Sequence, residues 1–493
     1  MAQEIKFGTD GWRGVIAKDF TFENIALVSS ATADQFLEDL NKCKSEVTSS
    51  LITNLVFIGY DRRFLGKEFA TRVSEIFLQK GLNVHLYNKD VPTPMVSFDV
   101  KKKNAVGGIV ITASHNPPEF SGFKIKQPDG CSASKEYTDR IEKRIDETAN
   151  RGNSEKNIEN NNVKIIEPSK DYIDFIKKTI DLEKLKNINE TVIVDSMHGT
   201  GGNYIESFLS GGGEKIKVKT IRSEIDVNFG GINPEPMMPQ LEPLSKEVIK
   251  NKAFIGLATD GDADRVGAID DRGEYINTHK LLAILLYYLI EKRKLSGGVI
   301  ITFSQSVLVK KMAKHFGLKL YEVPIGFKHI SDLMLKEDIL IGAEEANGIG
   351  TKLHYIPERD GIFNALLLLE ALHSFNLKPS ELIEKIHKEF GTFFYDRIDV
   401  HIPNPTMGKD FVERIKSNPP KELNGFKIND IQTLDGTKLI FEDESWLLFR
   451  ASGTEPLLRI YCEARNKDMV QKMLKIGEVL FKEGMAHHAS TVS

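Results

Sequence analysis

Residues 55–87, LVFIGYDRRFLGKEFATRVSEIFLQKGLNVHLY, decide the fold class. The run at 55–60 is apolar, residues 67–79 have the spacing of an amphipathic helix, and a second apolar run follows at 82–87. A strand, a helix and another strand in this order are typical of α/β layers. Because similar apolar runs recur around 192–195 and 299–302, we expect the α/β pattern to fill most of the chain.

At 493 residues the chain is too long for a single core, and three features divide it. The stretch 147–162 is polar and low in complexity, and a turn signal lies at 270–273. After the break at 385–392 the pattern changes to short strands and one helix, as in a smaller α+β module. We therefore expect four domains, at residues 1–162, 163–272, 273–388 and 389–493.

Composition excludes several classes of protein. Lys and Arg number 66 against 70 Asp and Glu, a net charge of −4, so nothing indicates a nucleic-acid or membrane partner. The longest apolar stretch, 281–290, is too short to span a bilayer. The three cysteines share no metal-ligand spacing, and the first residues, MAQEIKFGTD, do not form a signal peptide. We expect a cytoplasmic protein, either a monomer or a homodimer.

A serine stands where covalent chemistry is favoured. The strand-like run 106–111 leads into Thr-Ala-Ser-His-Asn-Pro-Pro, which places Ser114 in a turn made by Asn116 and two prolines. A hydroxyl held at the end of a buried strand suits a covalent intermediate. A purely structural turn is the alternative.

An acidic loop, DGDADR at 260–265, follows the apolar run 254–258. Its three carboxylates converge only in a tight loop, which Gly261 permits, and they repel one another unless a cation neutralises them. Ligation by oxygen atoms alone suits Mg²⁺. A calcium-binding EF-hand fails, because Arg265 occupies the position that needs glycine and a strand follows. An acidic surface turn stays open as an alternative.

Three further loops are ambiguous when each is taken alone. The run RASGTEP at 450–456, followed by Arg459, has the small residues and arginines of a phosphate cradle. The loop 342–348 holds Glu344 between glycines, where a carboxylate can accept hydrogen bonds from sugar hydroxyls. The glycine-rich run 7–14 carries Arg13. An ordinary turn is the alternative for each loop.

Together these segments resemble the α-D-phosphohexomutase superfamily, which includes phosphoglucomutase, phosphomannomutase and phosphoglucosamine mutase. The resemblance spans nearly the whole chain. The matching segments are FGTDGWRG at 7–14, TASHNPPEFSGFK at 112–124, DGDADR at 260–265, VPIGFK at 323–328, the loop after Ile341, ERDGI at 358–362 and RASGTEPLLRIY at 450–461.

The resemblance implies a fold and a reaction. The fold has three similar α/β sandwich domains with mixed sheets and a C-terminal α+β domain, arranged around a central active-site cleft. The reaction interconverts hexose 1-phosphate and hexose 6-phosphate, of glucose, mannose or both, through phospho-Ser114 and a hexose 1,6-bisphosphate intermediate. Mg²⁺ would be the cofactor, and the bisphosphate also the activator. The alternatives are a phosphoglucosamine mutase and a non-catalytic sugar-phosphate-binding protein.

The resemblance also implies the roles of individual residues. Those at the reacting centre are Ser114, Arg13, His115 and Lys124, with Lys124 favoured for proton transfer. The metal ligands are Asp260, Asp262 and Asp264, together with the phosphate on Ser114. The residues expected to bind the sugar phosphate are Asp264, Arg265, Lys328, Glu344, Ala346, Arg359, Arg450, Ser452, Gly453, Thr454 and Arg459.

The sugar loop departs from the pattern of the superfamily. Its Gly-Glu-x-Ser-Gly becomes Gly-Glu-x-Ala-Asn here, with Ala346 in place of serine and Gly348 where some members have histidine. The residue after Ala346, Asn347, could supply another contact to the sugar. The pair Glu344 and Glu345, with the GTDGWRG opening, favours glucose or mannose. Closure of the last domain on the substrate is also expected.

Overall fold

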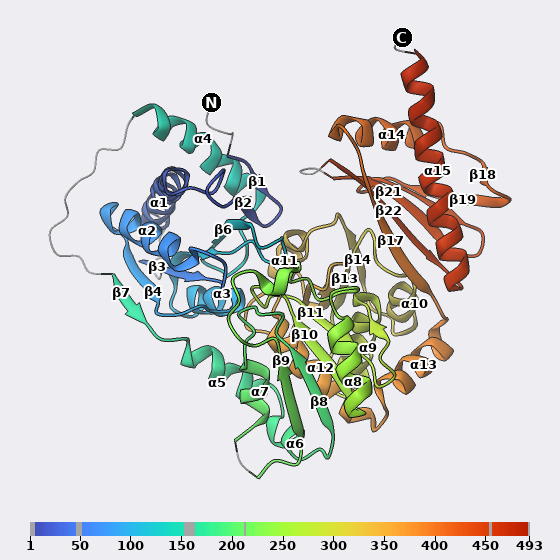
Figure 1. Cartoon of the computed structure of the whole chain (residues 1–493), viewed down its shortest axis with the longest axis horizontal. Coiled ribbons are helices and arrows are strands. Elements are labelled where there is room, and N and C mark those ends of the chain that lie inside the picture. The colour runs from blue at the N-terminus through green and yellow to red at the C-terminus, as the bar shows by residue number, and fades with distance from the viewer. Residues whose placement is uncertain (1–4, 46–51, 152–162, 212, 453–455, 492–493) are drawn as a thin grey trace.

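The chain folds into four units, each built on its own β-sheet (Figure 1). Three sheets combine parallel and antiparallel strands, and the fourth is wholly antiparallel. The computed structural model describes residues 5–45, 52–151, 163–211, 213–452 and 456–491. Three mixed α/β units and one α+β unit confirm the predicted fold class.

The first sheet contains the strand–helix–strand unit predicted at 55–87. Parallel strands β3 and β4, joined by α2, lie beside β5, and the strand order is β1-β2-β6-β5-β3-β4-β7. The elements are β1 (Phe7–Gly8), β2 (Gly11–Val15), α1 (Phe22–Ser45), β3 (Thr53–Tyr60), α2 (Gly66–Gln79), β4 (Asn83–Tyr87), α3 (Thr93–Lys102), β5 (Ala105–Ile111), β6 (Phe120–Lys126), α4 (Lys135–Arg151) and β7 (Lys164–Ile166).

The second and third sheets have five and four strands, in the orders β12-β11-β10-β8-β9 and β14-β13-β15-β16. The second unit contains α5 (Lys170–Thr179), α6 (Leu182–Lys186), β8 (Thr191–Asp195), α7 (Tyr204–Leu209), β9 (Lys217–Ile221), α8 (Glu242–Asn251), β10 (Ile255–Thr259), β11 (Val266–Ile269) and β12 (Tyr275–Ile276). The third contains α9 (Thr278–Glu291), β13 (Gly298–Thr302), α10 (Val307–His315), β14 (Leu320–Val323), α11 (Phe327–Lys336), β15 (Ile339–Ala343), β16 (Ile349–Thr351), α12 (Gly361–Phe375) and α13 (Pro379–Phe390).

Helix α12 joins the second unit to the third. Its sequence, GIFNALLLLEALHSF, is apolar on nearly every face, and residues 361–372 are all buried. The helix packs against α9 of its own unit and against β10 and β11 of the second. One continuous apolar core consequently runs through the first three units.

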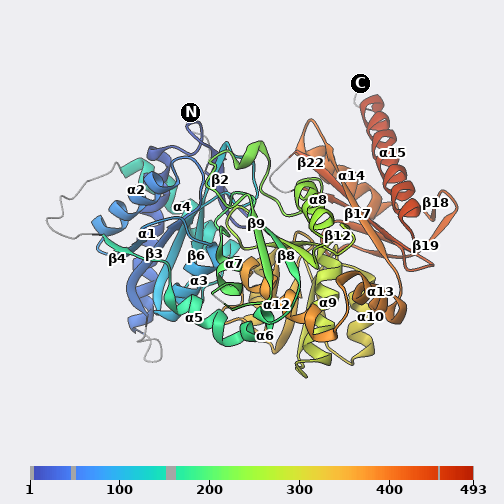
Figure 2. The same ribbon diagram turned by 60° about the horizontal axis from the view of Figure 1, so that its bottom comes forward.

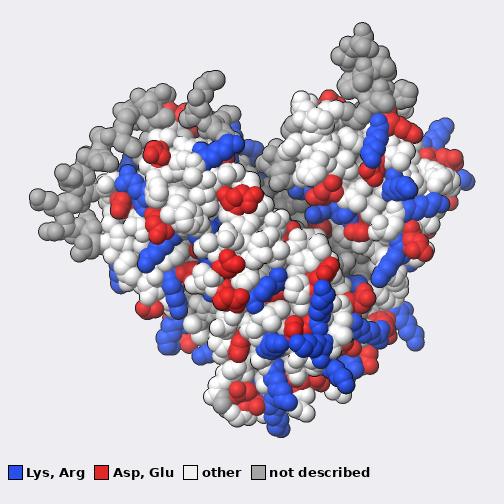
Figure 3. All heavy atoms as spheres, viewed as in Figure 1, with Lys and Arg blue, Asp and Glu red and all other residues white. Residues whose placement is uncertain are grey.

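The fourth unit has a six-stranded sheet and a separate core. A small cluster made by Phe303, Trp446, Leu448 and Tyr461 joins it to the third unit. Figure 3 shows a notch between the lobes of the first and fourth units, and Figure 2 shows the units side by side. The elements are β17 (Phe394–His401), α14 (Pro405–Ser417), β18 (Glu422–Leu423), β19 (Phe426–Gln432), β20 (Thr437–Phe441), β21 (Trp446–Ala451), β22 (Leu457–Ala464) and α15 (Lys467–Thr491).

The domain bounds at 162, 272 and 388 stay a prediction. Strand β7 pairs with β4, so the first sheet continues just past residue 162. Residues 152–162 of the polar stretch lie outside the described part of the chain. Cys131 and Cys462 are free thiols. Among the described helices, none is long and apolar enough to cross a membrane.

Candidate active site

Ser114 lies in the loop between β5 and β6, and its side chain is fully buried. Its backbone has a φ of 54°, a left-handed conformation that non-glycine residues rarely adopt. The Ser114 amide donates to the Thr112 hydroxyl at 2.8 Å, and its Oγ donates to Asp260 Oδ2 at 2.8 Å. Strain of this kind is typical of functional loops, and here it aims the hydroxyl at the acidic loop.

The acidic loop joins β10 to β11 and brings its three aspartates together. One carboxylate oxygen from each of Asp260, Asp262 and Asp264 lies within 4.8 Å of the others, and all three side chains are buried. The left-handed residue of the turn is Ala263, with a φ of 57°. Gly261 has another role: a Cβ there would lie 2.4 Å from the Ser114 carbonyl oxygen, so the glycine permits close approach of the two loops.

The electrostatics of these aspartates fit a cation. Burial, with the charges of Asp262 and Asp264, raises the pKa of Asp260 well above its usual value. Burial opposes ionisation of Asp262, but Lys124 and a hydrogen bond from Thr93 lower its pKa. The Oδ1 atoms of Asp262 and Asp264 are buried and accept no hydrogen bond from any described residue. Unsatisfied carboxylate oxygens beside three buried acids suit Mg²⁺.

Lys124 partly neutralises the same cluster. Its Nζ lies 2.8 Å from Asp10 Oδ2, 2.7 Å from Asp262 Oδ2 and 3.1 Å from Asp264 Oδ2. Burial favours the neutral amine, yet these three carboxylates hold the pKa of Lys124 above its usual value. Asp10 has no distinctive signal in the sequence, although it belongs to the FGTDGWRG run; only the fold shows that it faces Lys124.

Arg359 connects the first three units at one point. Its Nη1 donates to Glu344 Oε1 at 2.8 Å, and its Nη2 donates to Asp10 at 2.8 Å and Asp264 at 2.9 Å. Arg359 thus links a predicted metal ligand to the predicted sugar carboxylate. Both of its terminal nitrogens already donate to protein carboxylates.

Three other predicted residues surround Ser114. His115 Nδ1 lies 3.4 Å from the serine Oγ, and Arg13 donates to Asn116 in the same loop. Burial, with the charges of Arg265 and Arg13, lowers the pKa of His115 well below its usual value, which favours a neutral imidazole. Arg265 Nε lies about 4 Å from both Asp260 and Asp264. The structure thus brings the predicted reacting-centre residues together.

The sugar loop corrects one expectation. Asn347 does not face open space: its Nδ2 donates to the Pro236 carbonyl at 2.7 Å, and its Oδ1 accepts from Thr278. Its φ of 65° turns the side chain inward, where it joins the second and third units, so it is unable to replace the missing serine. Glu345 also turns away and pairs with Arg397 at 3.1 Å. Ala346 is partly exposed and Glu344 is buried.

Two facing arginines, Arg450 and Arg459, flank the predicted phosphate loop. Arg450 on β21 is directly opposite Arg459 on β22, an unfavourable pairing of like charges unless an anion lies nearby. Asp435 lies 3.0 Å from Arg450, and Asp399 lies 3.6 Å from Arg459. Ser452 is buried. Gly453 and Thr454 lie outside the described residues, so their predicted contacts stay predictions.

Lys328 is half-buried on α11, between the first and third units. Burial lowers its pKa, and its charged neighbours are Lys135, Asp332 and Asp139. None of these belongs to the serine loop or the acidic loop. Its predicted contact with the substrate is therefore not supported by a shared network and stays a prediction.

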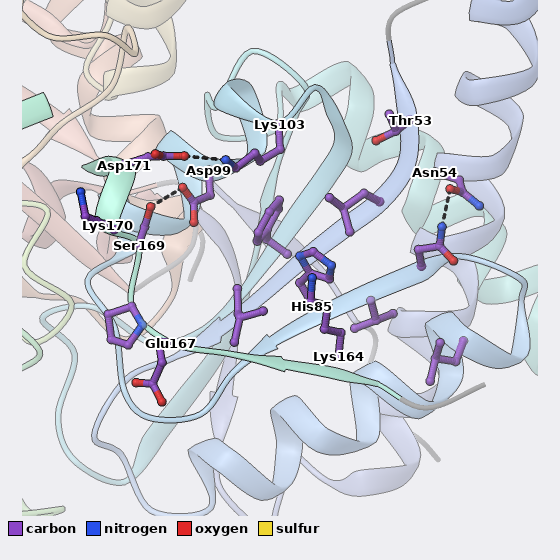
Figure 4. Close-up of a pocket in the computed structure, with 17 residues that line it drawn as sticks. Thr53, Asn54, His85, Asp99, Lys103, Lys164, Glu167, Ser169, Lys170 and Asp171 are labelled. Atoms are coloured by element: carbon purple, nitrogen blue, oxygen red, sulfur yellow. Dashed lines mark hydrogen bonds and ion pairs between the residues drawn. The ribbon is translucent and has the colours of Figure 1, made fainter. Parts of the chain in front are cut away.

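A separate cavity of about 900 Å³ lies over β3, β4 and β7 (Figure 4). It contains none of the predicted site residues. Several polar groups of its lining are already paired with one another: Lys103 with Asp171, Ser169 with Asp99 and Asn83 with Asn54. The reactive groups therefore concentrate at the junction of the units.

Four family models match the chain in sequence. The phosphoglucomutase/phosphomannomutase α/β/α domains I, II and III match residues 4–152, 170–273 and 277–390, and the C-terminal domain of that family matches 412–475.

Individual relatives agree with these matches. A phosphoglucomutase/phosphomannomutase of Thermococcus kodakarensis is 30% identical over 97% of this chain and 99% of its own. A phosphoglucosamine mutase of Methanococcus aeolicus is 31% identical over 88% of this chain and 93% of its own. The crystal structure of a Thermus thermophilus protein assigned as a phosphomannomutase superposes with a TM-score of 0.84, at 32% identity, over 98% of this chain and 100% of that one. The chain therefore belongs to the phosphoglucomutase/phosphomannomutase family, within the α-D-phosphohexomutase superfamily.

Proposed function

We propose that this protein interconverts the 1- and 6-phosphates of glucose, mannose or both, through phospho-Ser114 and a hexose 1,6-bisphosphate. The observation that carries the proposal is the buried Ser114 hydroxyl, 2.8 Å from Asp260 and beside two further aspartates. Three carboxylates around one hydroxyl form an incomplete site. A phosphoryl group on the serine and a divalent cation would complete it.

Asp260, Asp262 and Asp264 would hold Mg²⁺, with a phosphate oxygen on Ser114 as a further ligand. The bound cation would withdraw negative charge from the phosphoryl oxygens. Arg13, His115 and Arg265 surround the same position and orient the phosphoryl group. The remaining work of the protein is alignment, because phosphoryl transfer asks little covalent chemistry of the enzyme.

The transfer conserves atoms and charge. A free hydroxyl of the hexose monophosphate attacks phosphorus, the bond from phosphorus to Ser114 Oγ breaks, and a phosphate ester forms on the sugar. The Lys124 ammonium group, which its three carboxylate partners keep protonated, would donate a proton to the departing serine oxygen, and the resulting neutral amine would accept the proton of the attacking hydroxyl. After the bisphosphate has reoriented in the site, Ser114 Oγ attacks the other phosphoryl group and the proton returns to the sugar oxygen. The net result moves the phosphate between the two positions.

Reorientation of the bisphosphate intermediate requires anchors that accept two opposite poses of the sugar. Arg450, Ser452 and Arg459 would bind the phosphate that is not reacting, because two guanidinium groups that face each other offer paired donors to a phosphate. Glu344 would accept hydrogen bonds from sugar hydroxyls in either pose. The 453–454 segment is expected to contribute to the phosphate grip.

Phosphoglucosamine mutase is the second candidate, because the Methanococcus aeolicus relative carries that name at 31% identity. Glu344 argues for the first candidate. Its carboxylate already pairs with Arg359 at 2.8 Å, so its charge is compensated before any sugar binds. A compensated carboxylate is better matched to a neutral hydroxyl than to the ammonium group of glucosamine.

A coupled assay tests the choice of sugar. Glucose, mannose and glucosamine 1-phosphates are compared with Mg²⁺ and a hexose 1,6-bisphosphate present, and comparable rates with the first two are expected. A clear preference for glucosamine 1-phosphate would establish the second candidate instead. Ser114→Ala should bind the sugar phosphate without turnover. Full turnover by that variant would refute the serine's role, and binding without turnover by the wild type would indicate a non-catalytic protein.

A further inference from the structure

Two neighbouring arginines, Arg62 and Arg63, donate hydrogen bonds to the backbone of loops on either side of the site. They lie in the turn Asp61-Arg62-Arg63, directly after β3 of the first unit. Neither is among the residues assigned above to the metal, the phosphoryl group or the sugar. Their donors nevertheless reach two loops that belong to different units.

Arg63 supports the serine loop. Its side chain is completely buried, and Nη2 donates to the carbonyl oxygens of Ser114 at 2.8 Å and Asn116 at 2.7 Å. Its Nη1 donates to the carbonyls of Pro117 at 2.6 Å and Phe120 at 2.9 Å. Three carbonyl oxygens of the loop and one at the start of β6 therefore converge on a single guanidinium group, which fixes the loop that carries the nucleophile.

Arg62 reaches into the second unit instead. Its Nε pairs with Asp90 of the first unit at 2.8 Å. Its Nη1 donates to the carbonyl oxygens of Ser223, at 2.8 Å, and His198, at 3.3 Å. His198 belongs to the loop 195–202, DSMHGTGG, which follows β8. Arg62 therefore ties the first unit to that loop.

The loop 195–202 lies directly against the acidic loop, because β8 and β10 are parallel neighbours with Asp195 opposite Ala258. The Thr200 amide donates to the Gly261 carbonyl at 3.0 Å. A Cβ on Gly199 would lie 2.6 Å from the Asp260 carbonyl oxygen, and one on Gly201 would lie 2.1 Å from Thr259 Oγ1. Two glycines are thus required for this close approach.

The same loop contains two consecutive strained residues. Met197 and His198 have φ values of 46° and 59°, although neither is glycine. Asp195 holds this conformation, because its Oδ1 accepts the Met197 amide at 3.0 Å and the Arg222 Nε at 2.9 Å. A strained loop that donates a backbone hydrogen bond to the acidic loop is suited to positioning the predicted metal ligands on it.

We propose that Arg62 is a positioning residue for the metal-binding aspartates, as Arg63 is for Ser114. One turn of the first unit then sets the distance between the nucleophile and the metal site of the second unit. The inference rests on the proposed function, since it assumes that Asp260, Asp262 and Asp264 bind Mg²⁺.

The test measures Mg²⁺ affinity by calorimetric titration in the full-length wild type, Arg62→Ala and Arg140→Ala. Arg140 is an exposed arginine of the first unit that contacts the ring of Tyr137, and it serves as the matched control. We expect Arg62→Ala to weaken Mg²⁺ binding by about tenfold or more. Its kcat should fall while its KM for glucose 1-phosphate stays near the wild-type value, because Arg62 touches no proposed sugar contact.

A second variant alters the contact between the loop 195–202 and the acidic loop without changing Arg62. Gly199→Ala keeps Arg62 but pushes on the Asp260 carbonyl, so it should weaken Mg²⁺ binding in the same way. Should Arg62→Ala not fold, Arg62→Lys replaces it, and we expect it to weaken Mg²⁺ binding because one ammonium group lacks the separate Nε and Nη1 donors that reach Asp90 and the two carbonyls. A wild-type Mg²⁺ affinity in the folded Arg62 variant, or an equal loss in Arg140→Ala, would overturn the inference. Absence of turnover in a wild type that binds Mg²⁺ would instead count against the proposed function.

Discussion

Two lysines, Lys124 and Lys438, are each only 1% exposed, yet their surroundings shift their pKa values in opposite directions. Lys124 lies where the first three units meet, with three carboxylates within 3.1 Å that hold its pKa above the usual value. Lys438 lies between the third and fourth units, between the rings of Phe303 and Trp446. Burial lowers its pKa to about 7.

The difference separates two kinds of contact between units. At the junction around Lys124, charges are compensated by charges, and a shared apolar core supports them. At the interface around Lys438, an aromatic and apolar cluster dominates, and Glu322 lies 3.6 Å from the ammonium group. The first arrangement suits a fixed reaction centre. The second suits a unit that separates and closes again, as the proposed reorientation of the sugar would require.

The largest expected effect comes from removing the positive charge of Lys124, where the first three units meet. Lys124→Met leaves Asp10, Asp262 and Asp264 without their common partner, which should destabilise the protein by about 3–5 kcal/mol. Turnover should be lost as well. Urea unfolding measures the first effect and the coupled assay the second. Lys135→Met, on the exposed face of α4, is the control. If Lys124→Met is as stable as this control, Lys124 does not stabilise the junction by compensating its carboxylates.

The next effect concerns binding at the fourth unit. Arg450→Met removes a charged donor from the predicted phosphate grip, so the KM for glucose 1-phosphate should rise by about 10–100-fold. The melting temperature should change little, because Arg450 does not belong to the shared core. Arg465→Met, an exposed arginine of the same unit paired with Glu444, is the control. An unchanged KM in Arg450→Met would remove this arginine from the phosphate site.

The third effect is the contribution of Lys438 to the dependence of stability on pH. Burial and Lys310 lower its pKa from 10.5 to about 7, while Glu322 and Glu463 oppose the shift. Between pH 7 and 10.5 the folded protein therefore binds fewer protons than the unfolded chain. Stability should rise with pH across this window, by up to about 1.4 kcal/mol per pH unit.

Lys438→Met should lack the contribution of Lys438 to that rise, and it should be at least as stable as the wild type at pH 7, since no charged amine is buried. Denaturant titrations at several pH values compare the two proteins. The same slope in both would show that Lys438 is charged in the folded state. The two buried lysines would then not differ in their charge at pH 7.

The smallest effect is expected from a charged pair at the edge of the same interface. Lys311 lies 2.8 Å from Glu444, but both side chains are at least one-third exposed. Lys311→Met should therefore cost less than about 1 kcal/mol and leave KM and kcat near wild type. A larger loss of stability would mean that ion pairs, rather than the aromatic cluster, hold the fourth unit in place.

Local patterns in the sequence were sufficient for much of the site. The turn that bears Ser114 and the acidic loop each lie within a few residues of a strand end, so a short motif predicted them. The roles of Asp10, Arg62 and Arg63 could not be predicted from the sequence, because they arise from contacts with loops more than 50 residues away. A charged residue in a glycine-rich run or after a strand has no distinctive signal until the fold places it.

The failures have the same origin. Asn347 was expected to face the sugar because it follows Ala346 in the loop, but the left-handed backbone turns it toward Pro236. Gly261 was expected to permit a tight turn. Its absent side chain instead permits close approach to the Ser114 carbonyl, which lies in another unit. The buried position of α12 between two units likewise follows from packing rather than from its own pattern. Its apolar sequence predicts burial, though not what covers it.

Phosphorylation of Ser114 is the most direct test of the central claim. The protein is incubated with Mg²⁺ and glucose 1,6-bisphosphate, and its phosphopeptides are mapped before and after addition of glucose 1-phosphate. We predict one phosphoryl group per chain, on Ser114, which is transferred to the added sugar. A protein that is never phosphorylated, or that carries the phosphoryl group on another residue, would contradict the account.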